Sequence, residues 1–203
     1  MERLAVPVTR RVLLVAGATL VAAGRARAAD ADPRMADRGL GVATAPVVVE
    51  EWFSFTCPHC ARFATDMLPL VKAQLIDPGK VRWVFREYPR DQVDLMAAMV
   101  ARSLPAERYQ PFMETLLASQ KRWAFDRSVE PKDELAKMAA LAGMPRSLFD
   151  TVVADEGLKA AILAAQAKAE QSYNIDSTPT FIVNGHAHSG ETDIETFKKW
   201  VAS

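Results

Sequence analysis

The chain has 203 residues, half of them hydrophobic, and its 25 basic and 25 acidic side chains give a formal net charge of zero. A balanced charge gives no general attraction for nucleic acid or for an anionic membrane surface, so neither is predicted as a partner. The length is sufficient for a domain that buries an adequate core without disulfide bonds.

The first 28 residues are predicted to form an export signal that is cleaved after about Ala28. Arg10-Arg11 precede an apolar run from Val12 to Ala23, and Ala26-Arg27-Ala28 has the small-x-small pattern of a cleavage site. The run is shorter than the roughly 20 apolar residues that span a bilayer, which disfavours a membrane anchor. The paired arginines fit a twin-arginine signal and an ordinary secretory signal alike, so both routes to the periplasm stay open.

Residues 29–45 are small, polar and proline-containing, and they are predicted to be a lead-in to the fold. A strand is predicted from Val47 to Phe55, because it is apolar on both faces, as in a central strand covered by helices. A helix should begin at Pro58, where a missing N–H is no loss, and should end near Ile76. Residues 81–87 are predicted to form a second strand.

The segment from residue 91 to about residue 173 is predicted to be helical throughout. Asp91 is expected to cap a helix that runs through Val100, and a long Ala-rich helix is expected over residues 158–171. Three other helices are expected to start at prolines. One starts at Pro105 and is bent or interrupted at Pro111, one runs from Pro131 to Gly143, and one starts near Pro145.

The C-terminal residues are predicted to form a hairpin and a helix. Residues 180–183 and 186–189 are expected to be strands joined by the turn Asn184-Gly185. Thr192 and Glu195 have the spacing of a capping box for a last helix through Val201. The predicted order is therefore β-α-β, a block of helices, and β-β-α.

This order resembles an α/β thioredoxin-like fold with a mixed sheet, interrupted by an inserted all-helical domain. The thioredoxin-like domain would comprise residues 46–90 and 174–203, and the insertion residues 91–173. The insertion is too long to be a loop.

The only two cysteines stand at the junction between the first predicted strand and its helix, as Cys57-Pro58-His59-Cys60. Neither has any other cysteine of this chain to pair with, and Cys-x-x-Cys at such a junction is typical of a redox pair. Structural zinc is disfavoured because it requires four ligands and no second pair exists. In an exported protein this motif indicates chemistry on other proteins.

The two cysteines are predicted to differ in reactivity. Cys57 lies at the helix start, where unpaired backbone N–H groups and the helix dipole favour a thiolate, whereas Cys60 should be more shielded. We therefore expect Cys57 to be attacked and to carry the mixed disulfide, and Cys60 to close the pair. The His59 ring is expected to favour the thiolate further if it lies beside Cys57; the alternative is a ring that faces solvent.

The segment from Glu51 to Cys60, Glu-Trp-Phe-Ser-Phe-Thr-Cys-Pro-His-Cys, resembles the active-site segment of the DsbA family of periplasmic thiol:disulfide oxidoreductases. The likeness extends from about Ala45 to the C-terminus. It implies an enzyme that oxidises newly exported proteins with free cysteines and is re-oxidised by a DsbB-type quinone-linked membrane partner. No cofactor or metal is expected, and the protein is expected to be a monomer.

The resemblance assigns roles to two further positions. Glu51 falls where the family carries a buried acid, which can relay a proton to or from Cys60, while strand alternation directs Glu50 the opposite way. The alternative is that both glutamates are solvated. Thr178-Pro179 matches the cis-proline loop that packs against Cys57 and pairs with an extended substrate segment; the alternative is an ordinary trans turn.

Three functions are compatible with these residues, and an exported oxidase is the leading one. The best-known oxidases of the family have valine where this chain has Thr178, and threonine there resembles the disulfide isomerases. An isomerase or reductase is therefore the second, although residues 29–45 are too short for the dimerisation domain of DsbC-type isomerases. The third is a peptide-binding chaperone whose cysteines are incidental.

Two other groups of side chains have residue types that occur in binding sites. His186 and His188 alternate on one strand face, but no third ligand follows at metal-binding spacing, so a strand surface is preferred. Met96 and Met99 are predicted to pack in a helix core rather than to line a permissive substrate surface.

Overall fold

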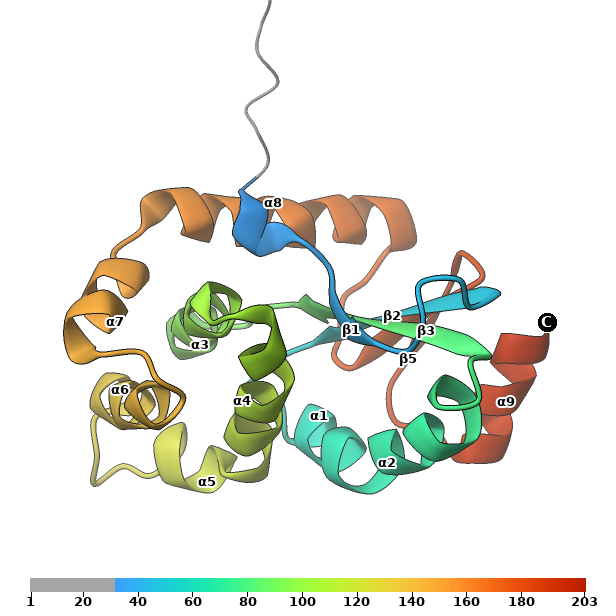
Figure 1. Ribbon diagram of the computed structural model, residues 1–203, viewed down its shortest axis with the longest axis horizontal. Helices are drawn as coiled ribbons and strands as arrows, with labels where there is room; N and C mark the ends of the chain where they lie inside the picture. Colours follow the sequence, from blue (N-terminus) through green and yellow to red (C-terminus); the bar gives the residue numbers. More distant parts are fainter. Residues whose placement is uncertain (1–31) are drawn as a thin grey trace, which may run out of the picture. The chain divides into compact units, whose positions relative to one another are not determined.

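One mixed five-stranded sheet organises the protein, with strand order β1-β3-β2-β4-β5 (Figure 1). The computed structural model describes residues 32–203, so the predicted export signal lies outside the described residues. β2 and β3 are parallel, and the other neighbouring strands are antiparallel. The strand bounds are β1 (Arg38–Leu40), β2 (Val47–Phe53), β3 (Val81–Glu87), β4 (Thr180–Val183) and β5 (His186–Ser189).

The connection between the parallel strands is helical from Pro58 to Ile76, as predicted, but it contains two wider turns. Its parts are α1 (Pro58–Arg62), the π-helical η2 (Phe63–Met67), α2 (Leu68–Val71) and the π-helical η3 (Lys72–Ile76). Pro69 has no N–H to donate to the Thr65 carbonyl, so the α-helical bond is missing where the first wide turn lies.

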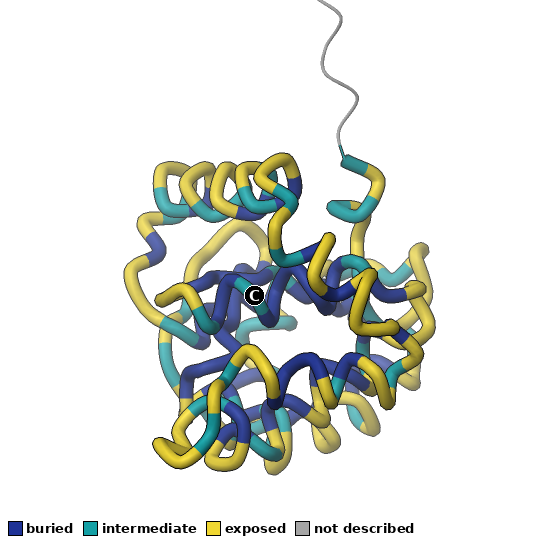
Figure 2. Tube along the Cα trace, turned by 90° about the vertical axis from the view of Figure 1, so that its left-hand side faces the viewer, coloured by how far each residue is buried: buried dark blue, intermediate teal, exposed yellow. Residues whose placement is uncertain are grey.

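Helices cover both faces of the sheet. Neighbouring residues of a strand point to opposite faces, and the central strands have buried residues at successive positions, so both faces need a covering layer. On one face, rings from the sheet meet rings of η2 and α9 (Ile194–Ala202): Phe63 stacks on Trp83 at 5.9 Å, and Phe181 meets Phe197 edge-on at 5.3 Å. On the other face, Trp52 of β2 belongs to a smaller cluster with Ala169 of α8 (Glu156–Tyr173). Figure 2 shows the buried segments gathered between these exposed outer layers.

The segment between β3 and β4 is all helical, which confirms the predicted insertion. Its helices are all α-helices: α3 (Gln92–Ser103), α4 (Ala106–Ala118), α5 (Gln120–Trp123), α6 (Pro131–Leu141), α7 (Arg146–Val153) and α8. Asp91 caps α3 as predicted, accepting from the Asp94 N–H at 2.8 Å.

The predicted interruption at Pro111 is wrong, because α4 continues through it. Pro111 lies on the exposed side of the helix. Solvent there can satisfy the Glu107 carbonyl, which has lost its usual N–H partner.

The lead-in contains an edge strand that the sequence did not predict. β1 pairs with β3 and is only three residues long, and it includes Gly39. A Cβ on Gly39 would lie 1.9 Å from the Trp83 carbonyl oxygen, so only glycine allows this close approach.

The C-terminal hairpin agrees with the prediction, but the start of α9 does not. Asn184 and Gly185 both have positive φ, 51° and 81°, as the predicted two-residue turn requires. The cap of α9 is Asp193, which accepts from the Thr196 N–H at 2.7 Å, so the predicted capping box on Thr192 is wrong by one residue. Among residues 32–203, no helix combines the length and apolarity needed to cross a bilayer.

Candidate redox site

Cys57 stands at the N-cap of α1, at the end of a tight turn that follows β2. The turn closes through a hydrogen bond from the Cys57 N–H to the Ser54 carbonyl at 3.2 Å, so β2 ends two residues before its predicted end. Cys57 has extended backbone angles, φ −88° and ψ 119°, and Pro58 is the first helical residue. The free N–H groups of the first helical turn therefore lie next to the Cys57 side chain.

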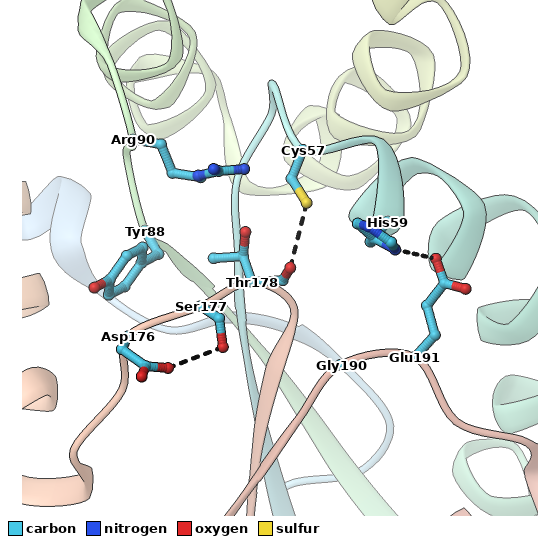
Figure 3. A pocket seen from close by; sticks show the side chains of 9 residues that line it. All are labelled: Cys57, His59, Tyr88, Arg90, Asp176, Ser177, Thr178, Gly190 and Glu191. Carbon is cyan, nitrogen blue, oxygen red and sulfur yellow. Dashed lines mark hydrogen bonds and ion pairs between the residues drawn. The ribbon is translucent and has the colours of Figure 1, made fainter.

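The Cys57 sulfur is held in surroundings that favour a thiolate. Its thiol contacts the Thr178 carbonyl oxygen at 3.3 Å (Figure 3). A hydrogen bond from the Cys60 thiol lowers the pKa of Cys57 most, burial opposes it, and Thr178 and the backbone N–H groups of Cys60 and His59 lower it further. The pKa falls from 9.0 to about 5.

Cys60 is the opposite case. Both side chains are buried, with Cys57 1% and Cys60 0% exposed, so the expected difference in shielding is absent. Burial nevertheless raises the pKa of the Cys60 thiol well above the ordinary value. The nearby Cys57 raises it further, against a stabilising N–H from Ser54 at 3.5 Å. The two cysteines are free thiols here, so this is the geometry of the reduced pair, with the predicted asymmetry between them.

Glu51 is buried close enough to Cys60 to raise the pKa of its thiol, and Glu50 points the opposite way. Burial raises the pKa of Glu51 to about 8, although the Trp83 ring N–H donates to its carboxylate at 3.0 Å. Glu50 instead accepts from Arg86 at 2.8 Å. The expectation of one buried acid is confirmed, and the alternative of two solvated glutamates is wrong.

The Thr178–Pro179 peptide bond is cis, as the resemblance implied. This bond lies in the loop between α8 and β4, and Thr178 of the loop contacts Cys57. A backbone bond from the Gly190 N–H to the Pro179 carbonyl at 2.8 Å ties this loop to the end of β5. The predicted cysteine and proline positions, far apart in sequence, therefore meet at one site.

A pocket of about 480 Å³ opens beside Cys57 and Thr178. Figure 3 shows side chains from several loops that converge on it, with the Cys57 sulfur directed towards Thr178. The other lining residues are His59, Tyr88, Arg90, Asp176, Ser177, Gly190 and Glu191. The Cys57 side chain therefore lines a space that is large enough to hold a ligand.

The His59 ring was expected to lie beside Cys57, but it bonds to other side chains. Its Nδ1 lies 2.8 Å from the Glu191 carboxylate and 2.7 Å from Arg62, and the ring is exposed (Figure 3). Glu191 also accepts from Arg62 at 2.9 Å, so the His59 ring joins an exposed ion pair and not the Cys57 sulfur. His59 acts on the Cys57 sulfur through its backbone N–H. Glu191 carried no signal in the sequence, because it is 132 positions from His59.

Two buried polar side chains of the insertion also reach the turn before Cys57. Asp94 accepts from the Phe55 N–H at 2.8 Å, and Gln120 donates to the Cys57 carbonyl at 2.9 Å. Neither residue could be identified from the sequence, because each lies within a helical stretch that offers no motif.

The histidines and methionines weighed as other sites lie away from this pocket. His188 stacks on Trp200 at 4.1 Å, and no cluster of three or more His, Cys, Asp or Glu side chains suited to a metal occurs within residues 32–203. Met99 is buried in the main core and Met96 packs against it, which confirms the core interpretation.

Comparisons with known proteins agree with this geometry. The model of the thioredoxin family matches residues 34–203. The crystal structure of alpha-DsbA1 from Wolbachia pipientis is similar with a TM-score of 0.74 and 26% identity, over 82% of this chain and 89% of that one. BdbD from Bacillus subtilis has the same fold, with a TM-score of 0.69 and 22% identity, over 82% of this chain and 94% of that one.

A relative from Rickettsia prowazekii, provisionally described as a protein-disulfide oxidoreductase, is 30% identical over 73% of this chain. The aligned region is 54% of that protein, so the chain spans about half the length of the Rickettsia relatives it matches. The B. subtilis disulfide bond formation protein D is 25% identical over 80% of this chain and 74% of its own length.

Proposed function

The chain belongs to the DsbA family of thioredoxin-like proteins, and on that premise we propose that it is an exported thiol:disulfide oxidase. Its substrates would be newly exported or unfolded proteins with free cysteines, in the periplasm. The observation that carries the proposal is the contrast between Cys57, whose pKa is lowered to about 5, and Cys60, whose pKa is raised by burial.

The reaction begins with the Cys57–Cys60 disulfide of the oxidised protein. A substrate thiolate attacks the Cys57 sulfur, the bond between the cysteines breaks, and Cys60 leaves with the electron pair and takes up a proton. A second substrate thiolate then attacks the substrate sulfur of the mixed disulfide, and Cys57 leaves as a thiolate. The substrate loses two electrons and gains a disulfide, and the protein ends as the reduced pair.

The residues around the pair support these steps. Cys57 is a good leaving group because its thiolate is stabilised. Glu51 is mostly protonated at neutral pH, since its pKa is raised to about 8, and it can exchange a proton with Cys60 from below. The backbone of Thr178, next to the cis-proline, is available to pair with an extended substrate segment as an added strand.

Equilibration with glutathione buffers tests the direction of electron flow. A thiolate with a pKa near 5 stabilises the reduced form at pH 7 by about two pKa units, which corresponds to roughly 60 mV of potential. We expect a potential more oxidising than that of glutathione. A potential near that of thioredoxin, about −270 mV, would instead assign the protein as a reductase.

A disulfide isomerase is the second candidate, and Thr178 is the residue that favours it. The two activities are separated by supplying a substrate with scrambled disulfides and a fully reduced one, because an oxidase acts only on the latter. Gel filtration adds an independent measurement, since a tight dimer would favour an isomerase. A peptide-binding chaperone would retain its cellular role after Cys57→Ala, whereas the oxidase would lose it.

Export and re-oxidation are parts of the same proposal. Cleavage after about Ala28 predicts a mature protein whose N-terminal residue is Ala29, which N-terminal sequencing of the periplasmic protein would establish. A DsbB-type quinone-linked partner is expected to regenerate the Cys57–Cys60 disulfide, and its loss should leave the pair reduced in cells.

A further inference from the structure

The turn at residues 54–57 carries the reactive cysteine, and its backbone is bonded mainly to the helical insertion rather than to the sheet. Inside the turn, the Cys57 N–H bonds to Ser54 at 3.2 Å. The Thr56 N–H also stays within the turn, donating to the Ser54 hydroxyl at 3.2 Å. The Phe55 N–H and the Phe55 and Cys57 carbonyls bond instead to two helices of the insertion, α3 and α5. These helices therefore hold the segment from two sides.

Gln120 is the contact from α5. Its side-chain amide donates both hydrogens to the turn, to the Phe55 carbonyl at 2.8 Å and to the Cys57 carbonyl at 2.9 Å. Gln120 is only 6% exposed, so water does not replace these bonds. The Cys57 carbonyl also accepts the Ala61 N–H at 3.1 Å, so Gln120 fixes the peptide from which α1 begins.

Asp94 is the contact from α3. Its carboxylate is 1% exposed and accepts from three donors: the Phe55 N–H at 2.8 Å, the Ser54 hydroxyl at 2.5 Å and the Arg90 N–H at 2.9 Å. Ser54 in turn directs its own N–H at the Cys60 sulfur at 3.5 Å. The position of this carboxylate is thus linked through one residue to the second cysteine.

From these contacts we infer that Gln120 and Asp94 are positioning residues for the redox pair, and that the insertion tunes the reactivity of Cys57 through them. Neither side chain bonds to the Cys57 sulfur. They act by fixing the turn, and hence the direction of the His59 and Cys60 N–H groups that stabilise the thiolate. The inference rests on the proposed redox function.

Gln120→Leu tests the inference, because leucine keeps the approximate volume of glutamine but has no N–H to donate. The matched control is Gln110→Leu, since Gln110 is half-buried on α4 and its amide donates only to Glu114. Three quantities are measured for each protein: the thiol pKa of Cys57 from thiolate absorbance, the equilibrium constant with glutathione, and the melting temperature.

We expect Gln120→Leu to raise the pKa of Cys57 and to shift the glutathione equilibrium about three- to tenfold towards the disulfide form, a shift typical of losing a hydrogen bond or two. Gln110→Leu should leave both quantities unchanged. A purely structural role for Gln120 would lower the melting temperature and move neither the pKa nor the equilibrium constant, which would overturn the inference.

Asp94→Asn provides a second variant in case Gln120→Leu does not fold. Asparagine has the same shape but presents an NH₂ group either to Ser54 and Arg90, which both donate to Oδ2, or to the Phe55 N–H, which donates to Oδ1. In either orientation the turn should loosen and the Cys57 pKa should rise as well. An unchanged pKa in this variant contradicts the inference. An ordinary thiol pKa in the unmodified protein would instead refute the proposed function, so the two failures are distinguishable.

Discussion

Burial acts in the same direction on both cysteines and on Glu51, because it penalises the charged form of each. Hydrogen bonds decide the difference at Cys57, where a thiol, Thr178 and two backbone N–H groups outweigh the penalty. Cys60 and Glu51 have too few such partners, and the pKa of each is raised. The site therefore places a thiolate next to two groups that hold their protons at neutral pH.

The raised pKa of Glu51 predicts a specific dependence of stability on pH. Between about 4.5 and 8 the folded protein keeps a proton on Glu51 that the unfolded chain releases, so the free energy of unfolding falls as the pH rises through this window. The expected slope is roughly 1 kcal/mol per pH unit. The lowered pKa of Cys57 makes the free energy of unfolding rise with pH from about pH 5 to 9, which would mask the effect of Glu51. The measurement is therefore made in a Cys57→Ala background.

Denaturant unfolding of Cys57→Ala between pH 6 and 8 measures this slope, and Cys57→Ala combined with Glu51→Gln should flatten it. Asp94, whose pKa is raised to about 6, is unchanged in both proteins and contributes equally. Cys57→Ala with Glu50→Gln is the matched control and should retain the slope, because Glu50 faces Arg86 on the other side of the sheet. Equal slopes with and without Glu51 would contradict the assignment.

The residues that could be predicted from the sequence are those that belong to local patterns. The cysteine pair, Glu51 and Thr178-Pro179 stand at fixed positions within or beside recognisable segments. Glu191 and Gln120 act across long sequence separations, and neither lies in a motif. For the same reason the direction of the His59 ring could not be predicted, since it depends on a carboxylate from the opposite end of the chain.

At the scale of helices and strands, prediction succeeded where a long apolar pattern or a strong turn signal was present. β3 and the two C-terminal strands have the predicted bounds. β1 was missed because three residues with a central glycine carry no pattern, and its strand conformation depends on pairing with β3. The wide turns η2 and η3 were missed because their periodicity differs little from that of an α-helix.

The cap of α9 provides a test at this scale. Asp193→Ala removes the acceptor of the Thr196 N–H and should lower the melting temperature by about 2–4 °C, as expected for the loss of a helix cap in a chain of this size. Thr192→Ala should have a much smaller effect, because Asp193 and not Thr192 is the capping residue. A larger loss from Thr192→Ala would restore the capping box predicted from the sequence.

At the scale of the whole described chain, we propose that residues 46–90 and 174–203 and the insertion at 91–173 are topological segments that fold together. One hydrophobic core includes residues of both. Arg102 of α3 joins them as well: it binds Glu87 of β3 at 2.7 Å and the Ala36 carbonyl at 2.8 Å, and it is 1% exposed. Residues 32–203 accordingly form one compact unit.

Arg102→Met tests this cooperativity. Methionine fills a similar space but leaves Glu87 as a buried charge without its cation, so the free energy of unfolding should fall by about 3–5 kcal/mol. The remaining transition should still be a single one by far-UV circular dichroism and by tryptophan fluorescence. Arg146→Met, which removes an exposed arginine paired on the surface of α7, should have little effect. Two separate transitions would show that the insertion folds independently.

The proposed oxidase activity depends above all on the acidity of one thiol, and titration of Cys57 in the reduced protein measures it directly. Thiolate absorbance should rise with a midpoint near pH 5, and Cys57→Ala should abolish that transition while Cys60 stays protonated to well above pH 9. A midpoint at or above 8.5, the value of an unperturbed cysteine, would contradict the account.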